Sequence, residues 1–247
     1  TGGTMALAAE AGHRVVLVLA TSGENGEPVD GVLDHGEDLH ARRSTESQES
    51  ADILGVHRLE CLGYVESGLM GDHTNDNPDS FWLADQHEAA TRLAAILQEA
   101  RADVLTIYDP NGGYGHPDHI QVHRVGTEAA ELAEVDRVYW ATMNRTKIQE
   151  LMAESAELRE SIDEERAENA ESEEFGLPEE DITHAIDVSA VLDRKRAAMA
   201  AHASQISAED FFLTLPPDAF AAAFGTEWFV APGWPRQGGE FGTTLFE

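Results

Sequence analysis

A short glycine-rich segment holds the side chains of this chain with the greatest capacity for chemistry. Residues 111–119 read Asn-Gly-Gly-Tyr-Gly-His-Pro-Asp-His, which places a phenol, a carboxylate and two imidazoles close together. His116 and His119 are three residues apart, so a helix that starts at Pro117 aims both rings toward the same side. One imidazole then suits metal binding and the other suits proton transfer. An ordinary surface pair is the alternative, because a bare His-x-x-His is a weak signal.

The segments on either side of this turn predict how it is positioned. Residues 103–108 form an apolar run that is typical of a buried strand, and a second apolar segment begins at Ile120. Glycines allow positive φ angles and let the backbone approach a ligand closely. In open α/β sheets, ligand sites lie at the carboxyl ends of strands, where this turn falls. Asp118 is the kind of neighbour that orients a functional imidazole.

Strand and helix patterns alternate along the whole chain. We expect strands at 14–20, 58–62, 104–108, 137–141 and 182–188, and helices from the start to about 11 and at 37–54, 86–100, 117–132 and 190–203, the last capped by Ser189. This alternation predicts an α/β protein, a three-layer αβα fold with a mostly parallel, Rossmann-like sheet. The Val-rich run at 14–20 is typical of a strand buried on both faces. The aromatic tail at 211–246 is expected to pack over the sheet edge or to line the pocket mouth.

Composition and charge narrow the function classes. The chain has 247 residues, of which 42% are apolar, and we expect a single domain over 1–247. The net charge of −31 argues against nucleic-acid and anionic-membrane partners. With no long apolar run and no visible signal peptide, we expect a cytoplasmic protein. Cys61, in an apolar run, predicts a buried thiol. The acidic stretch at 145–174 predicts a solvated helix and a mobile loop.

The segment at 108–119, Tyr-Asp-Pro-Asn-Gly-Gly-Tyr-Gly-His-Pro-Asp-His, resembles the second motif of the LmbE-like, or PIG-L, N-acetylglucosaminyl deacetylases. It is most similar to the actinobacterial mycothiol branch of that family. Further matches are Thr-Gly-Gly-Thr at 1–4, Thr-Ser-Gly-Glu-Asn-Gly at 21–26, the helix at 43–56, the loop at 63–71 and Ala-His-Ala-Ser-Gln at 201–205. The resemblance therefore covers nearly the whole chain.

This resemblance implies a zinc-dependent amidase that removes the acetyl group from an N-acetyl amino sugar conjugate, a small-molecule substrate. It implies that His119 binds zinc and that His116 stabilises the oxyanion or protonates the leaving amine. Asp118 would hydrogen-bond to His116, fix its tautomer and raise its pKa. Tyr114 would donate its hydroxyl to the developing oxyanion.

Two residues elsewhere are implied to bind the substrate. Arg43 matches a family arginine that clamps hydroxyl or phosphate groups, with an ordinary surface arginine as the alternative. Glu66 stands where relatives often carry Asp and would contact the sugar, with a solvated loop carboxylate as the alternative. Structural roles are the default for Glu24, His123, His202 and Gln205. Because the net charge is −31, we expect a neutral or weakly charged N-acetylglucosaminyl substrate rather than a polyanion.

One motif of the family, His-Pro-Asp-Asp-Glu, does not occur in the sequence. The resemblance assigns to it one His and one Asp as zinc ligands and a second Asp as general base. We expect this motif and the first strand to precede Thr1, so that one zinc per chain is held together with His119. A catalytically silent sugar-binding relative is the alternative. A nucleotide-binding module is disfavoured, because no Gly-x-Gly-x-x-Gly follows the strand at 14–20.

Overall fold

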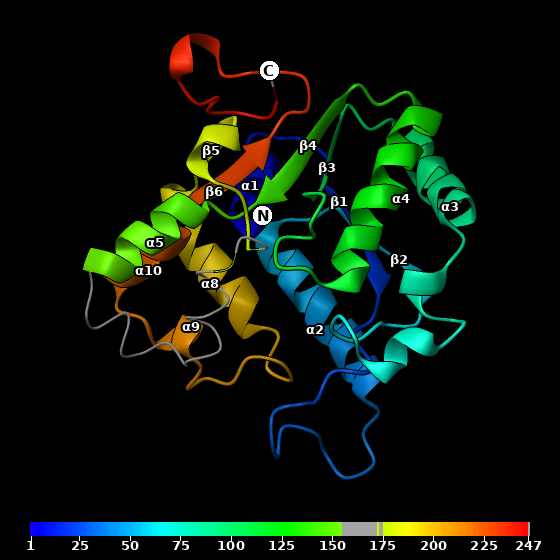
Figure 1. Cartoon of the computed structure of the whole chain (residues 1–247). Helices are drawn as coiled ribbons and strands as arrows, with labels where there is room; N and C mark the ends of the chain where they lie inside the picture. Colours follow the sequence, from blue (N-terminus) through cyan, green and yellow to red (C-terminus); the bar gives the residue numbers. More distant parts are fainter. Residues whose placement is uncertain (155–171, 173–174, 247) are drawn as a thin grey trace. The chain divides into compact units, whose positions relative to one another are not determined.

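The computed structural model describes residues 1–154, 172 and 175–246 of the chain (Figure 1). The chain divides into two compact units, one made of Thr1–Ala84 with Val188–Gly225 and the other of Asp85–Asp187 with Thr226–Glu247. The chain length predicts a single domain, and this prediction is not tested by the division into two units. None of the described helices is long and apolar enough to cross a membrane.

The first unit contains a parallel pair of strands and several helices. Its elements are α1 (Gly2–Glu10), β1 (Val16–Thr21), α2 (Leu39–Leu54), β2 (Arg58–Tyr64), α8 (Leu192–Ala200), α9 (Phe211–Thr214) and α10 (Pro217–Phe224). β1 pairs with β2 in parallel. The Asp38 carboxylate caps α2 by accepting the amide of Ala41 at 3.0 Å. α2 ends at Leu54, and the following Gly55 caps it with a φ of 78°, which suits glycine.

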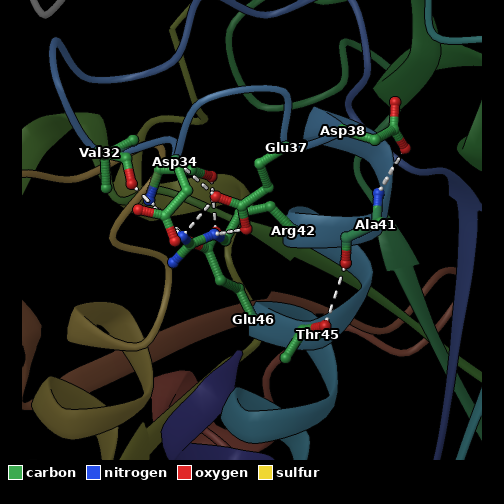
Figure 2. Close-up of polar contacts among 9 residues, drawn as sticks. Val32, Asp34, Glu37, Asp38, Ala41, Arg42, Thr45 and Glu46 are labelled. Carbon is green, nitrogen blue, oxygen red and sulfur yellow. Dashed lines mark hydrogen bonds and ion pairs between the residues drawn. The ribbon is translucent and has the colours of Figure 1, made fainter.

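The loop between β1 and α2 is fastened by Arg42 (Figure 2). Its Nε and Nη2 donate to the two carboxylate oxygens of Glu37 at 2.6 and 2.7 Å. Glu37 also accepts the backbone amide of Asp34 at 2.8 Å. Two of the Arg42 guanidinium nitrogens therefore have the Glu37 carboxylate as their hydrogen-bond partner, and this ion pair joins the loop to α2.

The second unit contains a mixed four-stranded sheet. Its elements are α3 (Gln86–Ala100), β3 (Val104–Tyr108), α4 (Pro117–Ala133), β4 (Arg137–Thr142), α5 (Arg145–Glu154), β5 (His184–Asp187) and β6 (Thr226–Val230). The strand order is β3-β4-β6-β5. β3 and β4 are parallel, and β6 runs antiparallel to both of its neighbours. α3 and α4 lie side by side in Figure 1, and both bury alanines that allow close approach, namely Ala89, Ala90, Ala129 and Ala130.

The predicted α/β class is confirmed, with one correction to the sheet. In the described residues the strand pairings are divided between parallel and antiparallel, so the sheet is mixed rather than mostly parallel. The tail was expected to cover an edge or a pocket mouth, yet its segment Thr226–Val230 is β6, a strand between β4 and β5. Its partners are distant in sequence, and a local pattern does not reveal such pairing.

Burial differs from prediction on both strands of the first unit. The residues of β1 are all half-buried, so the prediction of a strand buried on both faces is wrong. Cys61 is exposed, and the prediction of a buried thiol is wrong. Side chains alternate between faces along a strand, so the buried Leu62 beside it points to the other face.

Two further predictions are changed by the local structure. Ser189 does not cap the late helix, because it opens a 3-10 turn, Ser189–Val191, and α8 begins only at Leu192. The acidic stretch begins as the predicted helix, α5, but the mobile loop predicted after it lies largely outside the described residues.

Candidate active site

The glycine-rich turn joins β3 to α4 in the second unit. Gly112, Gly113 and Gly115 have φ angles of 67°, 79° and 86°, in the left-handed region that favours glycine. A Cβ on Gly112 would lie 2.7 Å from the Cβ of His119, so the turn packs directly on the first turn of α4. Pro117 occupies the start of α4, as predicted. Glycine is therefore required where the turn meets His119.

Asp109, the residue after β3, organises this turn from inside. It is fully buried, and its Oδ1 accepts the backbone amides of Asn111 and Gly113, both at 2.9 Å. Its Oδ2 accepts the hydroxyl of Thr142 at 2.6 Å. Sequence reasoning passed over Asp109, although an Asp at the start of a Gly-rich turn is a known signal for bonding to amides two residues on.

His119 is held in one tautomer. Its Nδ1 donates to the carbonyl oxygen of Gly112 at 3.1 Å, and its ring stacks on Tyr108 with centroids 3.9 Å apart. Burial, followed by the nearby His116, lowers the pKa of His119 to about 4, so the ring is neutral at pH 7. A neutral imidazole with a proton on Nδ1 has its lone pair on Nε2, which is the form that binds a metal.

His116 caps α4 through its side chain. Its Nδ1 accepts the backbone amide of Asp118 at 3.1 Å, so the neutral ring carries its proton on Nε2. The predicted hydrogen bond between Asp118 and His116 is therefore present, but its donor is the backbone amide of Asp118, and the carboxylate does not make it. Burial lowers the pKa of His116, although the charge of Asp118 opposes the shift. The prediction of a raised pKa is wrong, because desolvation outweighs the neighbouring carboxylate.

The turn brings the predicted catalytic side chains together. The rings of His116 and His119 are 4.9 Å apart, centroid to centroid. Tyr114 meets His119 edge-on at 5.2 Å and His116 at 6.1 Å, and it is 46% exposed. Asp118 lies in the first turn of α4 and is buried. The turn thus brings a phenol ring and two imidazole rings next to one another.

Arg43 lies in the first unit and is not a surface arginine. It is 4% exposed, and its Nη2 donates to the carbonyl of Gly26 at 3.2 Å. A Cβ on Gly23 or Gly26 would lie 2.9 or 2.8 Å from the guanidinium nitrogen Nη1, so both glycines make room for it. In the described chain its buried Nε finds no hydrogen-bond partner. The guanidinium therefore holds a buried donor whose hydrogen-bond capacity is not met in the described chain.

Glu66 connects two loops of the first unit. Its Oε2 accepts the backbone amides of Asn25 and Gly26 at 2.9 and 3.2 Å. Its own backbone amide donates to Glu24 at 3.1 Å, and Glu24 accepts the hydroxyl of Ser22 at 2.7 Å. The alternative of a free solvated carboxylate is wrong, because Glu66 fastens the loop that surrounds the Arg43 guanidinium. Its predicted contact with a sugar stays a prediction.

Of the two weaker histidine candidates, His123 has structural partners, whereas the buried Nδ1 of His202 has no hydrogen-bond partner in the described chain. His123 donates from Nδ1 to the carbonyl of Tyr108 at 3.0 Å and meets Trp140 edge-on. Next to His202, the backbone amide and hydroxyl of Ser204 donate to the buried Glu46 at 2.9 and 2.6 Å. The contacts of His123 support its default structural role, and the role of His202 stays a prediction.

His202 is expected to make the fold sensitive to acid. Burial lowers its pKa, the charge of Glu46 opposes this and the charge of Arg43 adds to it. The folded chain thus favours neutral His202, and this stability is present above the unfolded pKa of about 6.5 and is lost as pH falls below it. Between pH 7 and pH 5 the Tm of the parent should therefore fall further than the Tm of the His202→Asn variant. We expect the two falls to differ by on the order of a few degrees.

The matched control for this measurement is His87→Asn. Glu128 accepts from the exposed His87 and raises its pKa, so His87 contributes stability at low pH instead. Thermal melts over this pH range check the prediction. Identical pH slopes for His202→Asn and the parent would contradict it.

In the described part of the chain, no group of three or more His, Cys, Asp or Glu side chains could hold a metal ion. His119 nevertheless fits a metal ligand, because its tautomer, its neutrality and its fixed orientation are those that a metal requires. His119 is thus a candidate ligand for a metal ion.

The chain is similar to several deacetylases. The 1D-myo-inositol 2-acetamido-2-deoxy-alpha-D-glucopyranoside deacetylase of Acidothermus cellulolyticus is 38% identical over 241 residues, which cover 93% of this chain and 82% of the relative. The enzyme of the same name from Streptomyces avermitilis is 37% identical over 275 residues, covering 100% of this chain and 91% of the relative.

Solved structures support the fold. A conserved protein from Thermus thermophilus superposes with a TM-score of 0.58 at 21% identity, covering 96% of this chain and 89% of that one. The N,N'-diacetylchitobiose deacetylase of Pyrococcus horikoshii gives 0.57 at 18% identity, covering 94% and 76%. At these identities the likeness concerns the fold. Residues 1–130 match the family model PIG-L, GlcNAc-PI de-N-acetylase, and with the identity to the two deacetylases this match shows that the chain belongs to the PIG-L family.

Proposed function

We propose that this chain is a zinc-dependent hydrolase that removes the acetyl group from an N-acetylglucosamine conjugate. The observation that carries the proposal is the turn at 111–119, where the rings of Tyr114, His116 and His119 lie 4.9 to 6.1 Å apart, centroid to centroid. The names of the relatives support an N-acetylglucosaminyl inositol as the kind of substrate. A small soluble conjugate as substrate and a cytoplasmic location are parts of the same proposal.

His119 is the zinc ligand that the described chain supplies, through Nε2. We propose that one His and one Asp complete the zinc site and that a second Asp is the general base; the described residues hold no complete ligand group. The first motif of the family has the residue types for this task. Zinc, when bound, polarises a carbonyl and lowers the pKa of a water to about 7.

The residues of the turn stabilise the negative charge that develops on the amide oxygen. The Nε2–H of His116 and the hydroxyl of Tyr114 are both donors, and a donor already in place lowers the barrier without reorganisation. The backbone amide of Asp118 donates to Nδ1 of His116, and this hydrogen bond fixes the orientation of the ring and so of its Nε2–H. A neutral imidazole can act as such a donor at an oxyanion. Because the lowered pKa favours the neutral ring, stabilisation of the oxyanion is favoured over protonation of the amine as the main role of His116.

The direct test is release of acetate from 1-O-(2-acetamido-2-deoxy-glucopyranosyl)-myo-inositol by the zinc-loaded full chain. We expect acetate and free amine in equal amounts, and loss of both when zinc is removed by a chelator. If the zinc-loaded chain binds the glycoside without releasing acetate, the catalytically silent sugar-binding alternative is correct and the proposed hydrolase is not.

Replacing Tyr114 with phenylalanine should lower kcat about 10-fold or more, because one oxyanion donor is lost while the ring remains. Tyr114 is half-exposed, so folding and metal content should not change. Steady-state kinetics with elemental analysis of the same sample check this prediction. A kcat equal to that of the parent would remove Tyr114 from the catalytic group.

Replacing Arg43 with alanine should raise KM more than it lowers kcat, since we propose that its free donors bind substrate hydroxyl or phosphate groups. Arg43→Lys should not restore KM, because lysine lacks the planar fork of donors. The matched control is Arg42→Ala on the same helix, where the arginine is satisfied by Glu37. Equal effects of the two alanine variants would contradict a substrate role.

The same variants test the expected preference for uncharged substrates. With a net charge of −31, the parent should favour the neutral glycoside over a phosphorylated one, most clearly at low salt. A strong preference for the phosphorylated compound that neither salt nor Arg43→Ala alters would overturn this part of the proposal.

A further inference from the structure

The buried Asp109 and the histidine at the start of α4 contact opposite ends of one peptide group. The amide N–H of Gly113 donates to Asp109 Oδ1 at 2.9 Å. The carbonyl oxygen of Gly112, which belongs to the same peptide group, accepts from Nδ1 of His119 at 3.1 Å. A carboxylate, a peptide group and an imidazole are thus joined by two consecutive hydrogen bonds.

Such an arrangement has a chemical consequence. A metal-binding histidine commonly donates its second N–H to a carboxylate, which fixes the tautomer and makes the ligating nitrogen more basic. Hydrogen bonds in series polarise one another, so a carboxylate on the N–H end strengthens the acceptor at the C=O end. A peptide group inserted between carboxylate and histidine can therefore transmit the same effect.

The surroundings of Asp109 suit this role. The carboxylate is fully buried and accepts two backbone amides and the hydroxyl of Thr142, so both of its oxygens have hydrogen-bond partners. Its own carbonyl oxygen also accepts the amide of Gly112 at 2.9 Å. The peptide between Gly112 and Gly113 is therefore held by bonds on both sides.

We propose that Asp109 is a positioning residue for His119, which it controls through the Gly112–Gly113 peptide group. By orienting and polarising this peptide, Asp109 keeps the proton of His119 on Nδ1 and presents Nε2 as a basic ligand. The inference rests on the proposed function only for the identity of what Nε2 binds. The control of the tautomer is a property of the chain itself.

The variant Asp109→Asn tests the inference because it removes the charge while its side-chain oxygen can still accept both amides. Long-range ¹H–¹⁵N spectra of the metal-free full chain, with labelled histidine, report the tautomer of His119, whose signals are those absent in His119→Asn. We expect a single Nδ1–H tautomer in the parent and a measurable Nε2–H fraction in Asp109→Asn. The zinc Kd should rise about 10–100-fold.

Thr142→Val is the second variant, since it removes one donor to the carboxylate and keeps the shape of the side chain. It should shift the tautomer in the same direction by less, which keeps the test decisive if Asp109→Asn folds poorly. Asp136→Asn is the control, because it removes the same charge from an exposed position in the same unit.

The inference is overturned if His119 keeps the pure Nδ1–H tautomer and the parent zinc Kd in the folded Asp109→Asn and Thr142→Val variants. It is also overturned if Asp136→Asn produces the same shift. A parent chain that binds no zinc contradicts the proposed function, whereas the tautomer comparison still decides the role of Asp109.

Discussion

Replacing His119 with alanine is expected to abolish both zinc binding and deacetylation. We propose that His119 is a zinc ligand, because its Nδ1 donates to the Gly112 carbonyl and its Nε2 carries the lone pair. Loss of one of three protein ligands leaves too few to hold the metal. Elemental analysis and acetate release on the same purified sample measure the two effects together.

His119→Ala alone is ambiguous, because it also removes the hydrogen bond from the side chain to the carbonyl of Gly112 at 3.1 Å. The variant His119→Asn separates the two effects, since its amide N–H can replace the bond to Gly112 but offers no nitrogen at the Nε2 position. The control His123→Ala removes an imidazole one turn further along α4, which also donates to a backbone carbonyl. Zinc should be lost in His119→Asn and kept in His123→Ala, and full zinc occupancy in His119→Asn would falsify the assignment.

The parts of the fold that the sequence predicts well are those with local signals. α3 and β3 have the predicted bounds, Gln86–Ala100 and Val104–Tyr108. Their signals lie within or beside each element: Asp85 accepts the amide of Glu88 at the start of α3, and a short apolar run is typical of a strand. The C-terminal strand β6 was missed because its pairing with β4 and β5 joins segments far apart in the chain.

The same distinction holds at the candidate site. The spacing of His116 and His119 predicts their proximity, and the structure confirms it with ring centroids 4.9 Å apart. Their protonation could not be predicted, because it depends on burial, which opposes the effect of Asp118 on His116. The buried state of Arg43 was equally hidden, since it requires the glycines at 23 and 26 to be folded against α2. A residue type and a spacing predict which groups meet, whereas desolvation decides which protons they carry.

Replacing His116 with alanine is expected to lower kcat by about 10²–10⁴, the usual range for a lost acid–base or electrophilic group, with zinc retained. The structure raises a competing explanation for any such loss. His116 is also the N-cap of α4, through Nδ1 and the Asp118 amide, and losing an N-cap costs about 0.5–2 kcal/mol of stability. Because α4 carries His119 in its first turn, a frayed helix start could disturb the metal ligand without any catalytic role for His116.

The variant His116→Asn distinguishes these explanations, because asparagine is a good N-cap but has no group at the position of Nε2. If Nε2–H stabilises the oxyanion, His116→Asn should keep the Tm and zinc content of the parent and still lose the same factor of about 10²–10⁴ in kcat as His116→Ala. If His116 only caps α4, asparagine should restore kcat together with Tm. Melting curves, zinc content and kcat for the two variants therefore decide whether this histidine acts on the substrate or only on its own helix.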